Sequence, residues 1–236
     1  STLGASAVAT QRVEMVTAVT TPLFRYHPAV VAQAAATIDR LSEGRFRLGV
    51  GTGENLNEGP LGYPFPKYAE RADRMREALE IMRRLLDGEK LTFDGDWYRT
   101  DRAKLYSPPV SNVPIWMAAG GPKTAALAAT MADGTITSVR DPQTTKERVI
   151  DPAIEAATSA GRTIPTIAAS RWTIRADSAG DAWMALGAWR GLRAPGRLEA
   201  VDPADLRKRA DDLDRDEVLA AYSLVSEPTD YVAVYR

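Results

Sequence analysis

Residues 46–58, FRLGVGTGENLNE, join an apolar run to a glycine-rich turn that carries a carboxylate. The run predicts a strand over 46–51, and Thr52, Gly53 and Glu54 follow at its carboxyl end. In parallel α/β proteins, ligands bind beyond the carboxyl ends of the strands, so this turn is a candidate site. Glycines let backbone amides approach a ligand closely, and a glutamate buried there can act as a general acid. The spacing leaves a second interpretation open, in which an exposed Glu54 caps the next helix.

Strand and helix patterns alternate along the chain on both sides of this turn. Such alternation without hairpins indicates parallel strands. The amphipathic spacing of Met75, Leu79, Met82 and Leu86 is typical of a long helix. We expect strands at 12–20, 46–51, 114–118, 134–138 and 166–174, and helices at 28–41, 67–86, 123–131, 145–160 and 179–190.

The size of the chain favours one domain. The 236 residues are 44% hydrophobic, which suits a single α/β barrel with a substantial core. We therefore expect one barrel domain over residues 1–236, with a surface excursion at 87–110, where Asp-Gly and Gly-Asp pairs flank short aromatic strands. A closed barrel needs eight strands, and five are visible. We expect the first two strands and the last strand to lie outside this chain, and an open five-stranded sheet is the competing geometry.

Composition excludes several classes of function. Lys and Arg number 30 against 31 Asp and Glu, so no basic field favours nucleic acid or an anionic membrane. Cysteine is absent, which excludes disulfides and thiolate metal sites. The only histidine, His27, precedes a helix and cannot form a metal cluster alone, so we expect a structural role for it and no metal site. No apolar run is as long as a membrane helix, and we expect a cytoplasmic protein.

A second glycine turn follows the strand expected at 114–118. Ala118, Ala119, Gly120 and Gly121 precede Pro122, which opens a helix, and such a helix start can hold a phosphate or the edge of a flat ring. The spacing matches neither the Rossmann fingerprint nor a P-loop. Taken alone, this segment is more often a tight turn than a site.

Four segments in order carry a family resemblance: TAVTTP at 17–22, FRYHP at 24–28, GVGTGENLNE at 49–58 and AAGGP at 118–122. Together they resemble the deazaflavin-dependent luciferase-like oxidoreductases, and most of all the F420-dependent glucose-6-phosphate dehydrogenases. The resemblance implies a (β/α)8 TIM barrel of the luciferase-like type, which agrees with the alternation described above. It also implies oxidation of glucose 6-phosphate, or a related sugar 6-phosphate, at C1 to the lactone, with coenzyme F420 as hydride acceptor.

The resemblance also assigns roles to residues. The deazaflavin would lie against a bulge with a cis peptide bond, which falls at Ala18-Val19, and Glu54 would be the acid that protonates the ring. The remaining cofactor contacts would come from Thr52, Gly53, Asn57, Ala118, Ala119, Gly120 and Gly121. The phosphate of the substrate would contact Thr137, Arg140 and Lys208, where Arg140 replaces a lysine of the family and changes the geometry.

One departure from the family keeps other functions open. The family histidine that takes the hydroxyl proton lies upstream of the segments seen here, and His27 does not match its motif. The alternatives are an F420-dependent dehydrogenase of another alcohol, an FMN-dependent luciferase-like monooxygenase, and a catalytically silent barrel relative. Family members pair as homodimers, so we expect a homodimer with a small-molecule substrate.

Overall fold

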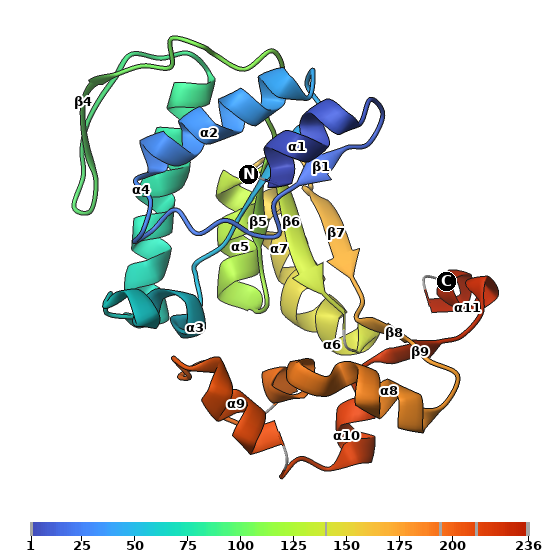
Figure 1. Cartoon of the computed structure of the whole chain (residues 1–236). Helices are drawn as coiled ribbons and strands as arrows, with labels where there is room; N and C mark the ends of the chain where they lie inside the picture. The colour runs from blue at the N-terminus through green and yellow to red at the C-terminus, as the bar shows by residue number, and fades with distance from the viewer. Residues whose placement is uncertain (1, 140, 194, 211, 235–236) are drawn as a thin grey trace. The chain divides into compact units, whose positions relative to one another are not determined.

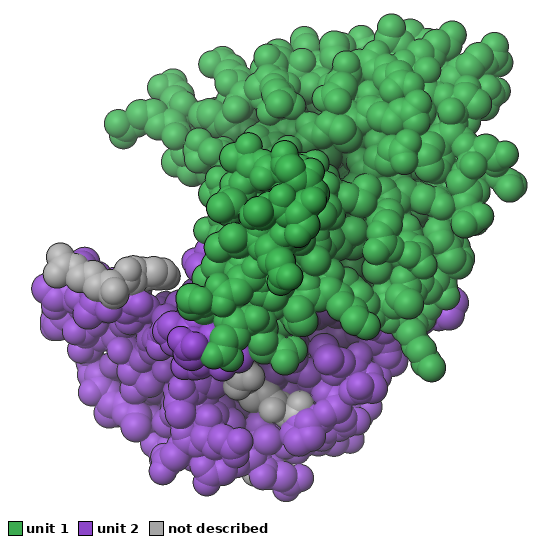
Figure 2. Space-filling model, turned by 180° about the vertical axis from the view of Figure 1, so that it is seen from behind, with its two compact units in different colours: residues 1–53, 66–137, 146–168 green, residues 54–65, 138–145, 169–236 purple. Residues whose placement is uncertain are grey.

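The computed structural model describes residues 2–139, 141–193, 195–210 and 212–234. They form two compact units, coloured separately in Figure 2. Unit 1 contains Ser1–Gly53, Pro66–Thr137 and Lys146–Ala168, and unit 2 contains Glu54–Phe65, Ser138–Thr145 and Ala169–Arg236. The expectation of one barrel domain stays a prediction.

A five-stranded sheet forms the centre of the βα pattern, in the order β1-β2-β5-β6-β7 (Figure 1). The pairs β1–β2, β2–β5 and β5–β6 are parallel, with Met15 opposite Phe46, Leu48 opposite Ile115 and Trp116 opposite Gly134. The strands are β1 (Met15–Val16), β2 (Phe46–Val50), β5 (Ile115–Ala118), β6 (Gly134–Ser138) and β7 (Thr166–Ser170). Every strand expected from the sequence pattern is therefore present.

The helices of unit 1 bury their apolar faces in two clusters, a large core and a smaller one that contains Ala119, Ala125, Ala129, Val149, Ala153 and Ala157. In α4, Met75, Leu79, Met82 and Leu86 are all buried, as the spacing predicts. In α2, the His27 ring accepts a hydrogen bond from the Ala29 N–H at 3.2 Å and caps the helix, which confirms its structural role. The helices are α1 (Thr2–Ala9), α2 (Pro28–Leu41), α4 (Tyr68–Leu86), α5 (Pro122–Met131) and α7 (Asp151–Ser159), and α7 follows a π-helical segment at Lys146–Ile150.

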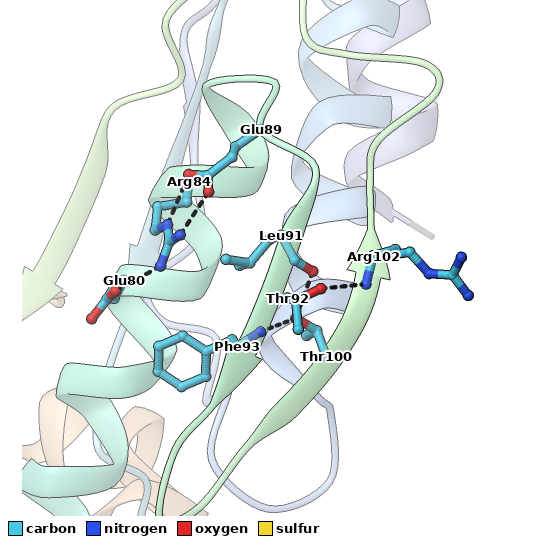
Figure 3. Close-up of polar contacts among 8 residues, drawn as sticks. All are labelled: Glu80, Arg84, Glu89, Leu91, Thr92, Phe93, Thr100 and Arg102. Atoms are coloured by element: carbon cyan, nitrogen blue, oxygen red, sulfur yellow. Dashed lines mark hydrogen bonds and ion pairs between the residues drawn. The ribbon is translucent and has the colours of Figure 1, made fainter.

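The segment 87–110 contains an antiparallel hairpin of β3 (Leu91–Asp94) and β4 (Arg99–Ala103). The Thr100 hydroxyl accepts from the Phe93 N–H at 3.1 Å and donates to the Leu91 carbonyl at 2.9 Å (Figure 3). On the adjacent end of α4, Arg84 lies between Glu80 and Glu89 and donates to both carboxylates. These hydrogen bonds stabilise the hairpin and the end of α4.

Unit 2 is built from short elements around its own small core. The strands β8 (Thr173–Arg175) and β9 (Ser223–Val225) pair in parallel. Its helical segments are α3 (Asn55–Glu58), the 3-10 segment Gly59–Leu61, α6 (Pro142–Thr145), α8 (Ala179–Leu186), the 3-10 segment Gly187–Arg193, α9 (Pro203–Ala210), α10 (Arg215–Ala220) and α11 (Pro228–Val234). The core contains Ile174, Ala182, Leu186, Val218, Leu219 and Tyr222.

Several element bounds differ from the sequence expectation. The strand expected at 12–20 is limited to Met15–Val16, because the chain then leaves the ladder. The strand expected at 166–174 is divided into β7 and β8, and β9 was not expected at all. None of the helices in the described part of the chain is long and apolar enough to cross a membrane.

Candidate cofactor and substrate site

A bulge interrupts the edge of the sheet directly after β1. The Thr17 hydroxyl donates to the Gly49 carbonyl at 2.7 Å and accepts from the Gly49 N–H at 2.9 Å. A side chain thus makes the hydrogen bonds that a neighbouring backbone makes in a regular strand pair. Pairing resumes where the Thr20 N–H donates to the same carbonyl at 2.9 Å. Between these points lies a cis peptide bond at Ala18-Val19, where the family resemblance places one. Val19 is 39% exposed, in contrast to the buried Met15 at the start of β1.

The bulge explains two glycines, Gly49 in β2 and Gly51 directly after the strand. A Cβ at Gly49 would lie 1.8 Å from the Thr17 carbonyl oxygen, and a Cβ at Gly51 would lie 2.6 Å from Cγ2 of Val19. No side chain fits at Gly49 while the bulge keeps this position. The glycine-rich pattern therefore reflects a close approach of two backbone segments.

The turn after β2 has a backbone that favours glycine. Gly53 has φ 83°, in the left-handed region. Its carbonyl accepts a hydrogen bond from Nη1 of Arg71 at 3.3 Å. Burial lowers the pKa of the Arg71 guanidinium, and the nearby Tyr68 opposes this effect. The half-buried Thr52 precedes this turn at the carboxyl end of the strand.

The segment Ala118–Gly121 leads from β5 into α5. The Ala119 N–H donates to the Ile136 carbonyl at 2.8 Å, which fixes the segment against β6. Among the described residues, no atom lies within 4 Å of a Cβ built at Gly120, so a small ligand group has room next to this backbone within unit 1. Gly121 is the N-cap residue of α5, and Nη2 of Arg148 would lie 3.6 Å from a Cβ there. A helix N-terminus and a nearby positive charge both favour an anion at this place.

Sheet order brings these segments of unit 1 together. The strands β1, β2 and β5 are adjacent and parallel, so the residues that follow them lie at one edge of the sheet. Ala18-Val19, Thr52-Gly53 and Ala118–Gly121 therefore lie at the same edge of the sheet, and their role as a cofactor site stays a prediction. Sequence reasoning missed Arg148, because its helix gives no sign of which turn it approaches.

Glu54 and Asn57 belong to unit 2, at the start and within the first turn of α3. The Glu54 carbonyl accepts from the N–H groups of Asn57 at 3.0 Å and Glu58 at 3.2 Å. Its side chain makes no capping hydrogen bond, is 49% exposed, and lies 3.6 Å from Nη1 of Arg197. The Glu54 carbonyl thus accepts the first hydrogen bonds of the helix, and its carboxylate makes no capping bond. Sequence reasoning missed Arg197, which comes from a distant part of the chain.

The residues assigned to the substrate phosphate differ in exposure. Thr137 is only 4% exposed, and the exposed hydroxyl at this strand end belongs to Ser138, whose Oγ lies 3.2 Å from Oγ of Ser170. Lys208 is exposed in the last turn of α9. Arg140 lies outside the described residues. Within the described part of the chain, no cluster of three or more His, Asp or Glu side chains could hold a metal ion.

Comparison with known proteins identifies the family. Residues 1–234 match the family model described as luciferase-like monooxygenase. The chain belongs to the luciferase-like monooxygenase family. This membership and the parallel sheet confirm the predicted luciferase-like α/β barrel class.

Relatives in this family cover nearly all of the chain. An F420-dependent glucose-6-phosphate dehydrogenase of Nakamurella multipartita is 37% identical over 99% of the chain and 70% of its own length. One from Nocardia farcinica is 39% identical over 93% of the chain and 67% of its own length. The solved structure of an F420-dependent secondary alcohol dehydrogenase with an F420-acetone adduct is 32% identical, with a TM-score of 0.92 over 99% of the chain and 72% of its own chain.

A more distant solved structure shares the fold alone. The coenzyme F420-dependent tetrahydromethanopterin reductase from Methanopyrus kandleri has 23% identity and a TM-score of 0.79. The barrel fold of the family is therefore shared with proteins that differ from this chain at most positions.

Proposed function

We propose that this chain is an F420-dependent dehydrogenase that acts on CH–OH groups, with glucose 6-phosphate or a related sugar 6-phosphate as substrate. The observation that carries the proposal is the bulge at Ala18-Val19, which packs against two glycines beside the open turn at Gly120. Relatives at 37% and 39% identity are F420-dependent glucose-6-phosphate dehydrogenases, which supports the same conclusion.

The residues of unit 1 fit a flat cofactor. The exposed Val19 side chain offers an apolar face, and the empty space at Gly120 leaves room for a ring edge or a phosphate next to the backbone. The N-terminus of α5 and Arg148 favour an anionic group at the same place. In the proposal, Ala18, Val19, Thr52, Gly53 and Ala118–Gly121 hold the cofactor, with Asn57 of α3.

Bound F420 would supply the hydride acceptor for oxidation of the carbon that carries the hydroxyl group. The protein's part is to orient the substrate and to move protons. Glu54, which the proposal makes the general acid, has a half-exposed carboxylate that lies 3.6 Å from Nη1 of Arg197. Thr137, Arg140 and Lys208 are assigned to the substrate phosphate, and the exposed Ser138 offers a second hydroxyl at the end of β6.

A second candidate substrate is an alcohol without a phosphate. The solved relative with a TM-score of 0.92 is an F420-dependent secondary alcohol dehydrogenase, and it supports this alternative directly. Profiling with matched phosphorylated and unphosphorylated alcohols separates the two candidate substrates.

We also propose a cytoplasmic homodimer of single-domain barrels, on the basis of the family resemblance.

Substitution of the proposed acid tests the function. In the complete enzyme, Glu54→Gln should slow F420 reduction more than tenfold, the usual scale for a general acid, while F420 still binds. Turnover at the wild-type rate would refute the acid role.

Lys208→Ala should raise the KM for phosphosugars and leave kcat for unphosphorylated alcohols unchanged, and an unchanged KM would place Lys208 outside the site.

A further inference from the structure

Residues 21–27 form an irregular segment that connects the bulge to α2. The segment begins at a fixed point, because the Thr20 N–H donates to the Gly49 carbonyl at 2.9 Å and the Thr20 carbonyl accepts from the Gly51 N–H at 3.0 Å. Pro22 then locks its own φ and restricts the residue before it. A displacement of the backbone after Pro22 is therefore passed to the bulge through a stiff link.

The Tyr98 side chain, from the turn between β3 and β4, is buried against this segment. Its hydroxyl donates to the Leu23 carbonyl at 2.9 Å and lies 3.3 Å from the Pro22 carbonyl oxygen. Tyr98 is 7% exposed, and its ring packs edge-to-face against the His27 ring with the centroids 5.6 Å apart. Burial raises the pKa of Tyr98 to about 12, so the hydroxyl keeps its proton and donates at neutral pH. The hairpin thus holds the backbone just beyond the stiff link.

Helix α4 fixes the turn that carries Tyr98. The Glu77 carboxylate accepts from the N–H groups of Asp96, Trp97 and Tyr98 at 2.8, 3.0 and 3.1 Å. Oε1 accepts the first of these bonds and Oε2 accepts the other two, so both oxygens hold the turn. The position of the Tyr98 hydroxyl is consequently set by α4.

Arg74 makes a second link between α4, the hairpin turn and the segment. Its guanidinium carbon lies 4.0 Å from the centroid of the Trp97 ring and 5.2 Å from that of the Phe24 ring. Nε and Nη2 of Arg74 both donate to Oε1 of Glu70, at 3.0 and 2.8 Å. Arg74 and Glu77 lie on one face of α4. This face therefore supports the segment through an aromatic contact as well as through the Tyr98 hydroxyl.

We propose that Tyr98 is a positioning residue for the cofactor site, whose hydroxyl holds the backbone at Leu23 and thereby keeps the bulge at Ala18-Val19 in the arrangement that binds F420. The inference rests on the proposed function, in which F420 lies against this bulge. Tyr98 acts through the backbone of residues 20–23. The hairpin then serves the site, although it lies outside the βα pattern.

Thr100→Val is the matched control for Tyr98→Phe. Each variant removes one hydroxyl group from the hairpin region and leaves a backbone group without that partner. The two hydrogen bonds of the Thr100 hydroxyl, to the Phe93 N–H and the Leu91 carbonyl, stay within the hairpin. A difference between the two variants at the bulge therefore reports the bond to Leu23.

Amide hydrogen exchange in the complete, cofactor-free protein measures the link directly. Tyr98→Phe should speed exchange of the Thr20 and Gly51 N–H groups about two- to tenfold, the factor that corresponds to one typical hydrogen bond. Thr100→Val should speed exchange of the Phe93 N–H and leave Thr20 and Gly51 within about twofold of wild type. Unchanged exchange at Thr20 and Gly51 in Tyr98→Phe, or equal acceleration there in both variants, would overturn the proposal.

F420 affinity separates positioning from a loss of stability. The apparent Kd scales with the fraction of binding-competent molecules, so destabilisation alone leaves it unchanged while nearly all of the protein is folded. Tyr98→Phe should raise the Kd for F420 about two- to tenfold, and Thr100→Val should keep the wild-type Kd. A wild-type Kd in Tyr98→Phe would contradict the role of Tyr98 in the site. If F420 binds to none of the three proteins, the proposed function fails, whereas the exchange rates still decide whether Tyr98 positions the bulge.

Discussion

Alanine at Gly49 should displace the bulge on which the cofactor site depends. The added Cβ would lie 1.8 Å from the Thr17 carbonyl oxygen and 3.0 Å from the Thr17 carbonyl carbon. An ordinary C···O contact is roughly 3.2 Å, so the two backbones must separate by more than about 1 Å. Overpacking of this kind costs about 1–3 kcal/mol. The movement also disturbs the two hydrogen bonds of the Thr17 hydroxyl, each worth about 0.5–1.5 kcal/mol.

Together these costs predict that Gly49→Ala lowers the free energy of unfolding by about 2–6 kcal/mol. A typical domain has about 5–15 kcal/mol in total, so the effect should be plain in guanidinium unfolding followed by circular dichroism. Fluorescence titration should show a loss of F420 affinity of at least tenfold, because Ala18-Val19 moves with Thr17. An unfolding free energy within about 0.5 kcal/mol of wild type, with unchanged affinity, would refute the reasoning.

Gly120→Ala is the matched control. Its Cβ would meet no atom of the described residues within 4 Å, so the free energy of unfolding should change by less than about 0.5 kcal/mol. F420 affinity should still fall at least tenfold, because the methyl group occupies the space assigned to the cofactor. Unchanged affinity in this variant would remove Ala118–Gly121 from the cofactor site.

Three further predictions concern the framework. The Glu77 carboxylate accepts from three N–H groups of residues 96–98 at 2.8, 3.0 and 3.1 Å, so Glu77→Gln should cost about 1–3 kcal/mol and speed amide exchange across 91–103. Burial raises the pKa of Tyr98 to about 12. The folded state therefore holds the Tyr98 proton above pH 10 while the unfolded chain loses it, and stability should fall between about pH 10 and 12, less steeply in Tyr98→Phe. The buried Asp39 accepts from the Val110 and Ser111 N–H groups and from the Ser111 hydroxyl at 2.8, 3.0 and 2.7 Å, so Asp39→Ala should lower the unfolding free energy by about 3 kcal/mol in guanidinium titration.

The parts of the fold with a local cause were predictable from sequence. The bounds of α2 agree with the prediction because a cap, a proline and an amphipathic face all lie within the segment. The extent of β1 was overestimated because the Thr17 hydroxyl bonds to Gly49, thirty-two residues away, and no local pattern encodes that contact. The strand β9 is three residues long and gives no periodicity to detect.

Some residues of the candidate site could likewise be predicted from sequence, and others could not. Thr52, Gly53 and Ala118–Gly121 could be proposed as site residues because strand ends and glycines are visible in sequence. Arg197 was missed because the approach of its turn to Glu54 depends on contacts between distant segments. The exposure of Glu54 also required the structure, since a strand-end glutamate can be buried or solvated with the same spacing.

Cofactor choice tests the central claim most directly. The complete protein should be titrated with oxidised F420 and, separately, with FMN, and the bound complexes then mixed with glucose 6-phosphate or a secondary alcohol. We predict saturable binding of F420, and its reduction when one of these substrates is added, with at most weak binding of FMN. Binding of FMN without binding of F420 would contradict the assignment and favour a flavin monooxygenase.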